Sequence, residues 1–118
     1  MLAVGEYLYG SVDERFIRMT TGFGAGVGRS REEICGILSG SIMLIGLKYG
    51  RTNSTEDDKG CMHRVAAFRD EFKEIYGTTQ CSELLQLDLG SEEDEYPCYF
   101  ILEQTANRLL ELLDDEAS

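Results

Sequence analysis

The chain has 118 residues, of which 42% are apolar and 28% charged, the balance of one globular domain with a modest core. Its formal net charge of -11 opposes binding to nucleic acid or docking on an anionic membrane, because both need clustered basic residues. No basic segment followed by an apolar one opens the chain, and the longest charge-free apolar run, 34–47, is too short to span a bilayer. We therefore expect a cytoplasmic protein whose four cysteines are not structural disulfides.

Two short helices are predicted in the first part of the chain. Apolar residues recur at helical spacing from Leu2, and this helix is expected to stop at Gly10. Asp13 is placed to cap a second helix over 14–21. Its inward face is expected to comprise Phe16, Ile17, and Met19 or Thr20.

Glycines occupy alternate positions from Gly22 to Gly28. Each would cost about 1 kcal/mol relative to alanine inside a helix, so the segment predicts a loop with positive φ angles or close backbone approach. It lacks the spacing of a dinucleotide fingerprint or a P-loop. A glycine loop before a helix start is a candidate anion or cofactor site, and a packing turn is the alternative. The candidate residues here are Gly24, Gly26, Gly28 and Arg29.

The next helix carries the clearest boundary signals. Ser30 and Glu33 form a capping-box pair, and the apolar pattern continues to about Tyr49, with Gly50 placed to end the helix. Small residues on one face would let another helix approach closely, so we expect this to be the central helix. That face contains Gly36, Gly40 and Gly46.

The second half of the chain predicts three further helices. A polar loop over 51–58 precedes a helix of about 58–76, and a short helix then holds Cys81. Pro97 suits the first turn of a last, amphipathic helix. No strand-like alternation is present. The sequence thus predicts an all-α fold: a single helical domain over 1–118, built as a compact bundle of five to six helices around a glycine-rich central helix.

The cysteines are the strongest candidates for chemistry, although none forms a C-x-x-C pair. Cys81 and Cys98 fall at predicted helix starts, where unpaired amides favour a thiolate, while carboxylates preceding Cys98 act in the opposite direction. Cys35 lies about one turn inside its predicted helix, and its neighbour Gly36 leaves room for a second sulfur, a metal or a substrate. All four, Cys61 included, could instead be inert core, because cysteine packs as a small hydrophobe.

The order of these features resembles the C_GCAxxG_C_C family of redox-active proteins. The resemblance covers most of the chain: the glycine segment 21–29, the Cys-Gly-Ile-Leu-Ser-Gly run of 35–40, and the later Cys81 and Cys98. It implies an all-helical domain with a redox or metal-related role. Carried over by position, the implied site residues are Cys35, Gly36, Gly40, Cys81 and Cys98.

The chain departs from the family pattern at two places. Ile37 stands where the family usually has alanine, which narrows the space beside the motif cysteine. The family's first cysteine should precede an Ala-Val pair that matches Ala3 and Val4, so it would fall ahead of Met1. Without that thiol a dithiol pair survives, whereas a four-thiolate metal site would need Cys61.

Three functions remain open at this point. The leading hypothesis is a thiol-based redox or electron-transfer protein, an oxidoreductase in the enzymatic case, in which two of Cys35, Cys81 and Cys98 cycle between dithiol and disulfide with an unidentified redox partner. The second is a module that binds zinc or an iron–sulfur cluster through the same cysteines. The third is a non-catalytic interaction domain or homodimer that uses the small-residue face, its cysteines merely buried.

Overall fold

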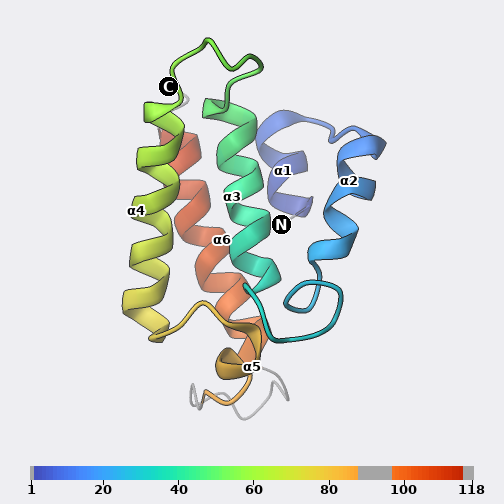
Figure 1. Cartoon of the computed structure of the whole chain (residues 1–118), viewed down its shortest axis with the longest axis vertical. Helices are drawn as coiled ribbons and strands as arrows, with labels where there is room; N and C mark the ends of the chain where they lie inside the picture. The colour runs from blue at the N-terminus through green and yellow to red at the C-terminus, as the bar shows by residue number, and fades with distance from the viewer. Residues whose placement is uncertain (1, 88–96, 116–118) are drawn as a thin grey trace.

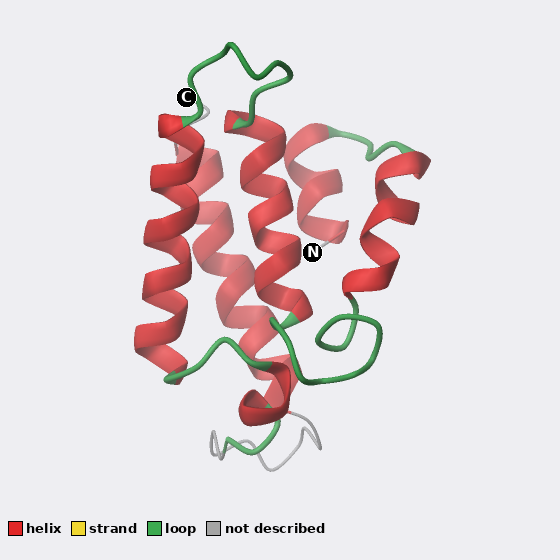
Figure 2. Ribbon diagram, viewed as in Figure 1, coloured by secondary structure: helices red, strands yellow, loops and turns green. Residues whose placement is uncertain are grey.

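The computed structural model describes residues 2–87 and 97–115, and its regular elements there are helices (Figure 2). They are α1 (Leu2–Tyr9), α2 (Glu14–Thr20), the 3-10 turn η1 (Thr21–Phe23), α3 (Gly36–Tyr49), α4 (Lys59–Tyr76), α5 (Cys81–Leu84) and α6 (Pro97–Asp115). The prediction of an all-α bundle of five to six helices is confirmed. No helix among the described residues has the length and apolar character needed to cross a bilayer.

Helix α3 is the centre of the bundle, as the sequence predicts. It packs against both α4 and α6, and α1 packs against α6. Figure 1 shows α3, α4 and α6 running alongside one another, with α2 at the edge of the molecule. Glycines and serines on α3 keep it narrow enough for neighbours on several sides.

The core forms where stripes of side chains on α4 and α6 face α3. On α4 the buried residues recur at intervals of four, which keeps them on one helical face. They are Phe68, Phe72 and Tyr76. On α6 the same spacing gives Ile101, Thr105, Leu109 and Leu113. Burying each large apolar side chain contributes about 1.5–3 kcal/mol, so these stripes determine how α4 and α6 are rotated against α3.

The predicted start of the central helix is wrong. Helix α3 begins at Gly36 rather than near Ser30, because Ser30 belongs to the glycine loop. Its hydroxyl donates to the carbonyl of Gly26 (2.8 Å) and accepts from the amide of Glu32 (3.2 Å). Residues 31–33 then bend, and Ile34 pairs with Gln80, so no helix forms before Gly36.

The second helix has the predicted cap but not the predicted burial. The Asp13 carboxylate accepts the backbone amide of Arg15 at 2.8 Å, which satisfies one of the unpaired amides of the first turn. The expected inward face does turn toward α3, since Phe16, Ile17, Met19 and Thr20 line a pocket with that helix, but no residue of α2 is buried. Met19, for example, is 72% exposed. The helix stands at the edge of the molecule, beyond α1 in the view of Figure 1.

Candidate functional site

Residues 33–35 and 79–81 pair at the lower end of the bundle in Figure 1. The pairing consists of an antiparallel bridge between Ile34 and Gln80, the Cys35 amide donating to the Thr79 carbonyl (2.8 Å), and the Cys81 amide donating to the Glu33 carbonyl (2.9 Å). Cys35 directly follows one bridge residue and Cys81 directly follows the other, so both cysteines lie next to this bridge.

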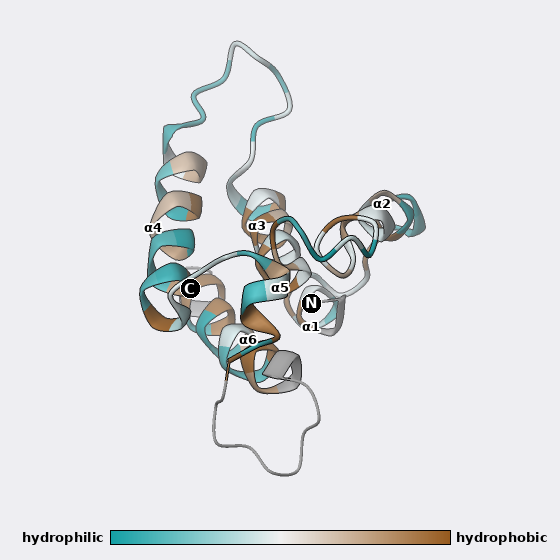
Figure 3. Cartoon of the chain, turned by 60° about the horizontal axis from the view of Figure 1, so that its bottom comes forward, coloured by the Kyte–Doolittle hydropathy of each residue, from teal (hydrophilic) through white to brown (hydrophobic). Residues whose placement is uncertain are grey.

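All four cysteines lie at helix starts, three of them at the same end of the bundle. Cys35 is the N-cap residue of α3, which corrects the expectation that it lies a turn inside that helix. Cys81 opens α5, as predicted. Cys98 is the second residue of α6, but its side chain lies outside what the structure describes. Figure 3 turns this end toward the viewer and shows α5 between α3 and α6. Cys61 lies in the first turn of α4, at the opposite end.

The two described thiols at this end are shielded from solvent. Cys35 is 5% exposed and Cys81 is 7% exposed. The segments that carry these two thiols meet at the Ile34–Gln80 bridge, so the fold keeps their backbones close while shielding the thiols from water.

The glycine loop packs directly against this cysteine pair. A Cβ atom added to Gly26 would lie 2.5 Å from the Cβ atom of Cys81 and 2.8 Å from the Cα atom of Arg31, so only glycine fits there. A Cβ atom added to Gly36 would lie 3.4 Å from the Phe23 carbonyl oxygen. The prediction of positive φ angles or close backbone approach in the segment from Gly22 to Gly28 is confirmed at Gly26, and this contact helps to exclude water from Cys81.

The same loop has a left-handed backbone that the glycine pattern only partly predicts. Gly26 and Gly28 have φ angles of 67° and 60°, as glycine permits. The intervening Ala25, Val27 and Arg29 also have positive φ, between 51° and 65°. Each such non-glycine residue costs about 1–2 kcal/mol, and the β-branched Val27 is the least suited of them. The surrounding structure therefore holds the loop in a strained conformation.

The residues predicted to bind a cofactor occupy different surroundings. Gly24, Gly36 and Gly40 line a groove between α3 and the segment that contains α2. Gly28 has open space around it, and Arg29 is exposed. Their role in holding a cofactor stays a prediction.

A tyrosine that the sequence interpretation missed lies near Cys35. Tyr76 is the last residue of α4, is buried, and donates its hydroxyl proton to Gln104 Oε1 at 2.7 Å. Burial raises the pKa of Tyr76 above its usual value, and the negative charge of a Cys35 thiolate raises it further. The sequence signal that could have revealed Tyr76 is its position: it ends a strongly amphipathic helix and lies only a few residues before Cys81.

Thr105 adds a second polar group to the α6 side of this region. Its side chain is buried, and within the described structure its hydroxyl makes no hydrogen bond of acceptable geometry. The Thr105 hydroxyl nevertheless lies close to the Tyr76 hydroxyl. This proximity lowers the pKa of Tyr76, but the rise caused by burial is larger. The hydroxyl groups of Tyr76 and Thr105 therefore make the core beside Cys35 more polar than aliphatic side chains alone would make it.

The described residues form no metal centre of their own. Within 2–87 and 97–115, no group of three or more histidine, cysteine, aspartate or glutamate side chains is arranged to hold a metal ion. The Cys98 side chain lies outside what the structure describes. The zinc or iron–sulfur site therefore stays a prediction.

Comparison with known proteins gives one match. No curated protein and no solved structure matches the chain. The family described as "Putative redox-active protein (C_GCAxxG_C_C)" matches residues 1–112. This is nearly the whole chain, and it contains every cysteine and the glycine loop. The protein belongs to the C_GCAxxG_C_C family.

Proposed function

We propose that the protein is a thiol–disulfide redox protein in which Cys35 forms a disulfide with Cys81 or Cys98. The observation that carries the proposal is the pairing between 33–35 and 79–81, which brings two buried cysteines next to the same bridge. The backbone of Cys98 begins α6 at the same end of the bundle. The family description, which names a redox activity, supports the same chemistry.

Cys35 is the better placed of the two described thiols to attack. It is the N-cap residue of α3, which has 14 residues, so its backbone lies at the positive end of a full helix dipole, although its side chain makes no hydrogen bond to the helix amides. A helix N-terminus favours the thiolate, which is the nucleophilic form. Cys81 opens α5, which has only four residues and a much weaker dipole.

The proposed oxidant is a disulfide of a small thiol or of another protein, R–S–S–R. The Cys35 thiolate attacks one of its sulfurs, which forms a mixed disulfide and releases one R–S⁻. The second protein thiolate then attacks the Cys35 sulfur, closes the protein disulfide and releases the second R–S⁻. Two protein thiols lose two electrons and two protons, and the oxidant takes both electrons and, on protonation, becomes two thiols.

An equilibrium redox titration tests this proposal. Protein is equilibrated in mixtures of reduced and oxidised dithiothreitol, unreacted thiols are alkylated, and the mass of the intact chain reports how many remain. We expect one reversible two-electron couple in the wild type. It should be absent in Cys35→Ser and retained in Cys61→Ser, since Cys61 lies at the other end of the bundle.

Peptide mapping of the oxidised protein identifies the second cysteine. A disulfide from Cys35 to either Cys81 or Cys98 supports the proposal, and the corresponding serine variant should then lose the couple. Absence of any two-electron couple in the wild type would overturn the proposal. A couple that survives Cys35→Ser would also overturn it, because Cys35 is its required member.

A further inference from the structure

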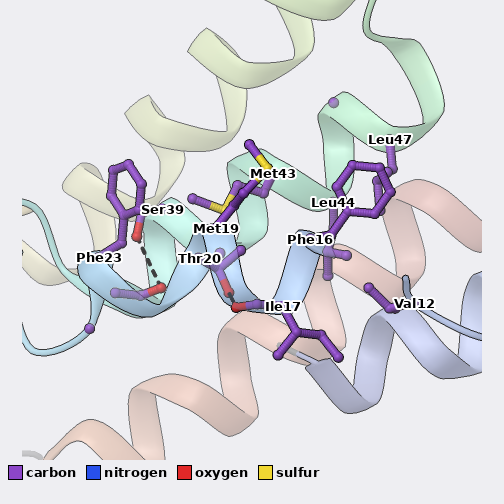
Figure 4. A pocket seen from close by; sticks show the side chains of 14 residues that line it. Val12, Phe16, Ile17, Met19, Thr20, Phe23, Ser39, Met43, Leu44 and Leu47 are labelled. Carbon is purple, nitrogen blue, oxygen red and sulfur yellow. Dashed lines mark hydrogen bonds between the residues drawn. The ribbon is translucent and has the colours of Figure 1, made fainter. Parts of the chain in front are cut away.

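An apolar groove lies between α2 and the central helix. It has a volume of about 580 Å³, with α2 and η1 forming the outer wall and α3 forming the inner wall (Figure 4). In that view Phe16 of α2 and Leu47 of α3 lie at the same end of the groove. No charged side chain is among the described residues that line it, although the chain carries a formal net charge of -11.

The exposed apolar side chains of the described residues concentrate at this groove. Nine large apolar side chains are exposed across the described structure, and five of these line the groove. The five are Phe16, Ile17, Met19, Phe23 and Leu47. Single exposed apolar residues are ordinary on protein surfaces, whereas a contiguous group is typical of a surface that binds another molecule.

Helix α2 buries none of its residues within the chain. It has only seven residues, and its Met19 is 72% exposed. A helix this short is not stable in water by itself, because its nucleation cost exceeds what its few hydrogen bonds return. A molecule that docks on α2 and the groove would supply the apolar contacts that the chain itself does not provide.

The exposed apolar area matches one side of a dimer interface. The five side chains together expose on the order of 500 Å². A standard protein interface takes about 800 Å² from each partner, and about 65% of a homodimer interface is apolar, which again gives about 500 Å² of apolar surface. The groove and its polar rim are therefore large enough for a second copy of the chain.

The distribution of charge favours a second copy over a strongly charged partner. The stretch 13–33, which runs from the cap of α2 past the glycine loop, carries four arginines and four carboxylates, so its formal charge is zero. The rest of the chain therefore carries the whole net charge of -11 and opposes contact between two copies. A surface with both signs in equal number can complement itself across a two-fold axis, whereas a strongly charged partner needs a patch of one sign.

We propose that the groove between α2 and α3 is the interface of a homodimer, in which two copies of this chain dock symmetrically through α2 and the exposed side of α3. Met19 is the most exposed of the five side chains, and it enters the groove of the other copy, since an unbranched thioether adapts to irregular gaps. The second copy supplies the contacts that α2 lacks. No cysteine takes part, so the proposal does not depend on the thiol chemistry and is tested on reduced protein.

Sedimentation velocity of the reduced protein over a range of concentrations tests the proposal. We expect a reversible monomer–dimer equilibrium in the wild type. Met19→Glu should weaken dimerisation at least tenfold, because a carboxylate taken into an apolar interface loses its hydration without gaining a partner. Met62→Glu is the matched control and should dimerise like the wild type. It replaces the same residue type, 60% exposed on α4 and outside the groove lining, and adds the same charge.

Two further measurements separate loss of the interface from loss of the fold. Met19 is not buried, so Met19→Glu should unfold in urea at the wild-type midpoint when both proteins are dilute and monomeric. Hydrogen exchange locates the interface. When the wild-type concentration is raised until dimers form, the α2 amides should exchange more slowly, and the amides in the first turns of α4 should not change.

Salt tests the argument from charge. Two chains of net charge -11 repel each other at long range, and salt screens that repulsion, so the dimer should become tighter as ionic strength rises. An interface held by opposite net charges would instead weaken. A dimer that dissociates on addition of salt would therefore refute the role assigned to the neutral stretch 13–33.

Three results would overturn the proposal as a whole. A wild-type chain that stays monomeric at every concentration up to its solubility limit would do so, and would leave the groove to a small molecule or to a different protein. A dimer that Met19→Glu leaves intact, or that Met62→Glu weakens equally, would place the interface elsewhere. A dimer in which the α2 amides gain no protection would lead to the same conclusion.

Discussion

Replacing Gly26 by alanine tests whether the glycine loop is fitted to the cysteine pair. The added Cβ atom would lie 2.5 Å from the Cys81 Cβ atom and 2.8 Å from the Arg31 Cα atom. Neither neighbour is the end of a flexible side chain, so the backbone of the loop or of the paired segments must move. The φ angle of 67° adds a second, independent cost for any residue that has a Cβ atom.

The expected loss of folding stability in Gly26→Ala follows from these two contributions. A positive φ costs a non-glycine residue about 1–2 kcal/mol. Forcing extra volume into a packed region costs about 1–3 kcal/mol more. Gly26→Ala should therefore destabilise the fold by about 2–5 kcal/mol. Gly28→Ala is the matched control, because its φ of 60° is similar but its added Cβ atom meets nothing within 4 Å. It should lose only about 1–2 kcal/mol.

Equilibrium unfolding in urea under reducing conditions measures both variants. A shift of the midpoint with an unchanged m-value reports stability alone. In a Cys61→Ser background, a thiol reagent should also modify the folded Gly26→Ala variant faster than Gly28→Ala, since only the former displaces the loop from Cys81. Equal destabilisation of the two variants, with equal thiol reactivity, would show that the loop does not pack on Cys81 as described.

Three further predictions follow from single sites. Gly46→Ala should stabilise the fold by about 0.5–1 kcal/mol in urea, because alanine is the better helix former and its Cβ atom enters open space, and a loss of stability would contradict that geometry. Wild-type stability should fall as the pH rises above about 10, where the unfolded Tyr76 ionises but the buried phenol of raised pKa keeps its proton, and Tyr76→Phe should reduce this fall while the exposed Tyr7→Phe should not. Asp13→Ala should speed hydrogen exchange of the α2 amides without moving the global unfolding midpoint, because the cap is lost from a helix that buries nothing, and a large midpoint shift would argue against this.

Local signals in the sequence predict most of the helices well. Asp13 caps α2, Pro97 opens α6, and α4 ends before Gly77. Each signal acts locally, within one or two turns of its own residue. Asp13 supplies a hydrogen bond, Pro97 fixes a φ angle, and Gly77 lacks a side chain. The start of α3 is the exception. The Ser30 to Glu33 pattern fits a capping box, but Ser30 belongs to the glycine loop, and the pairing with residues 79–81 delays the helix until Gly36.

The sequence alone determined the helical class, the central position of the glycine-rich helix, and the cysteines and glycine loop that identify the family. Only the tertiary structure decided that Cys35 is the N-cap residue of α3, that it lies next to the same bridge as Cys81, and that Gly26 contacts that cysteine. The groove beside α2 is likewise invisible in the sequence, where an amphipathic helix predicts burial. The physical reason is the sequence separation over which each feature acts. Caps and periodicity depend on neighbouring residues, whereas strand pairing and cavities depend on residues tens of positions apart.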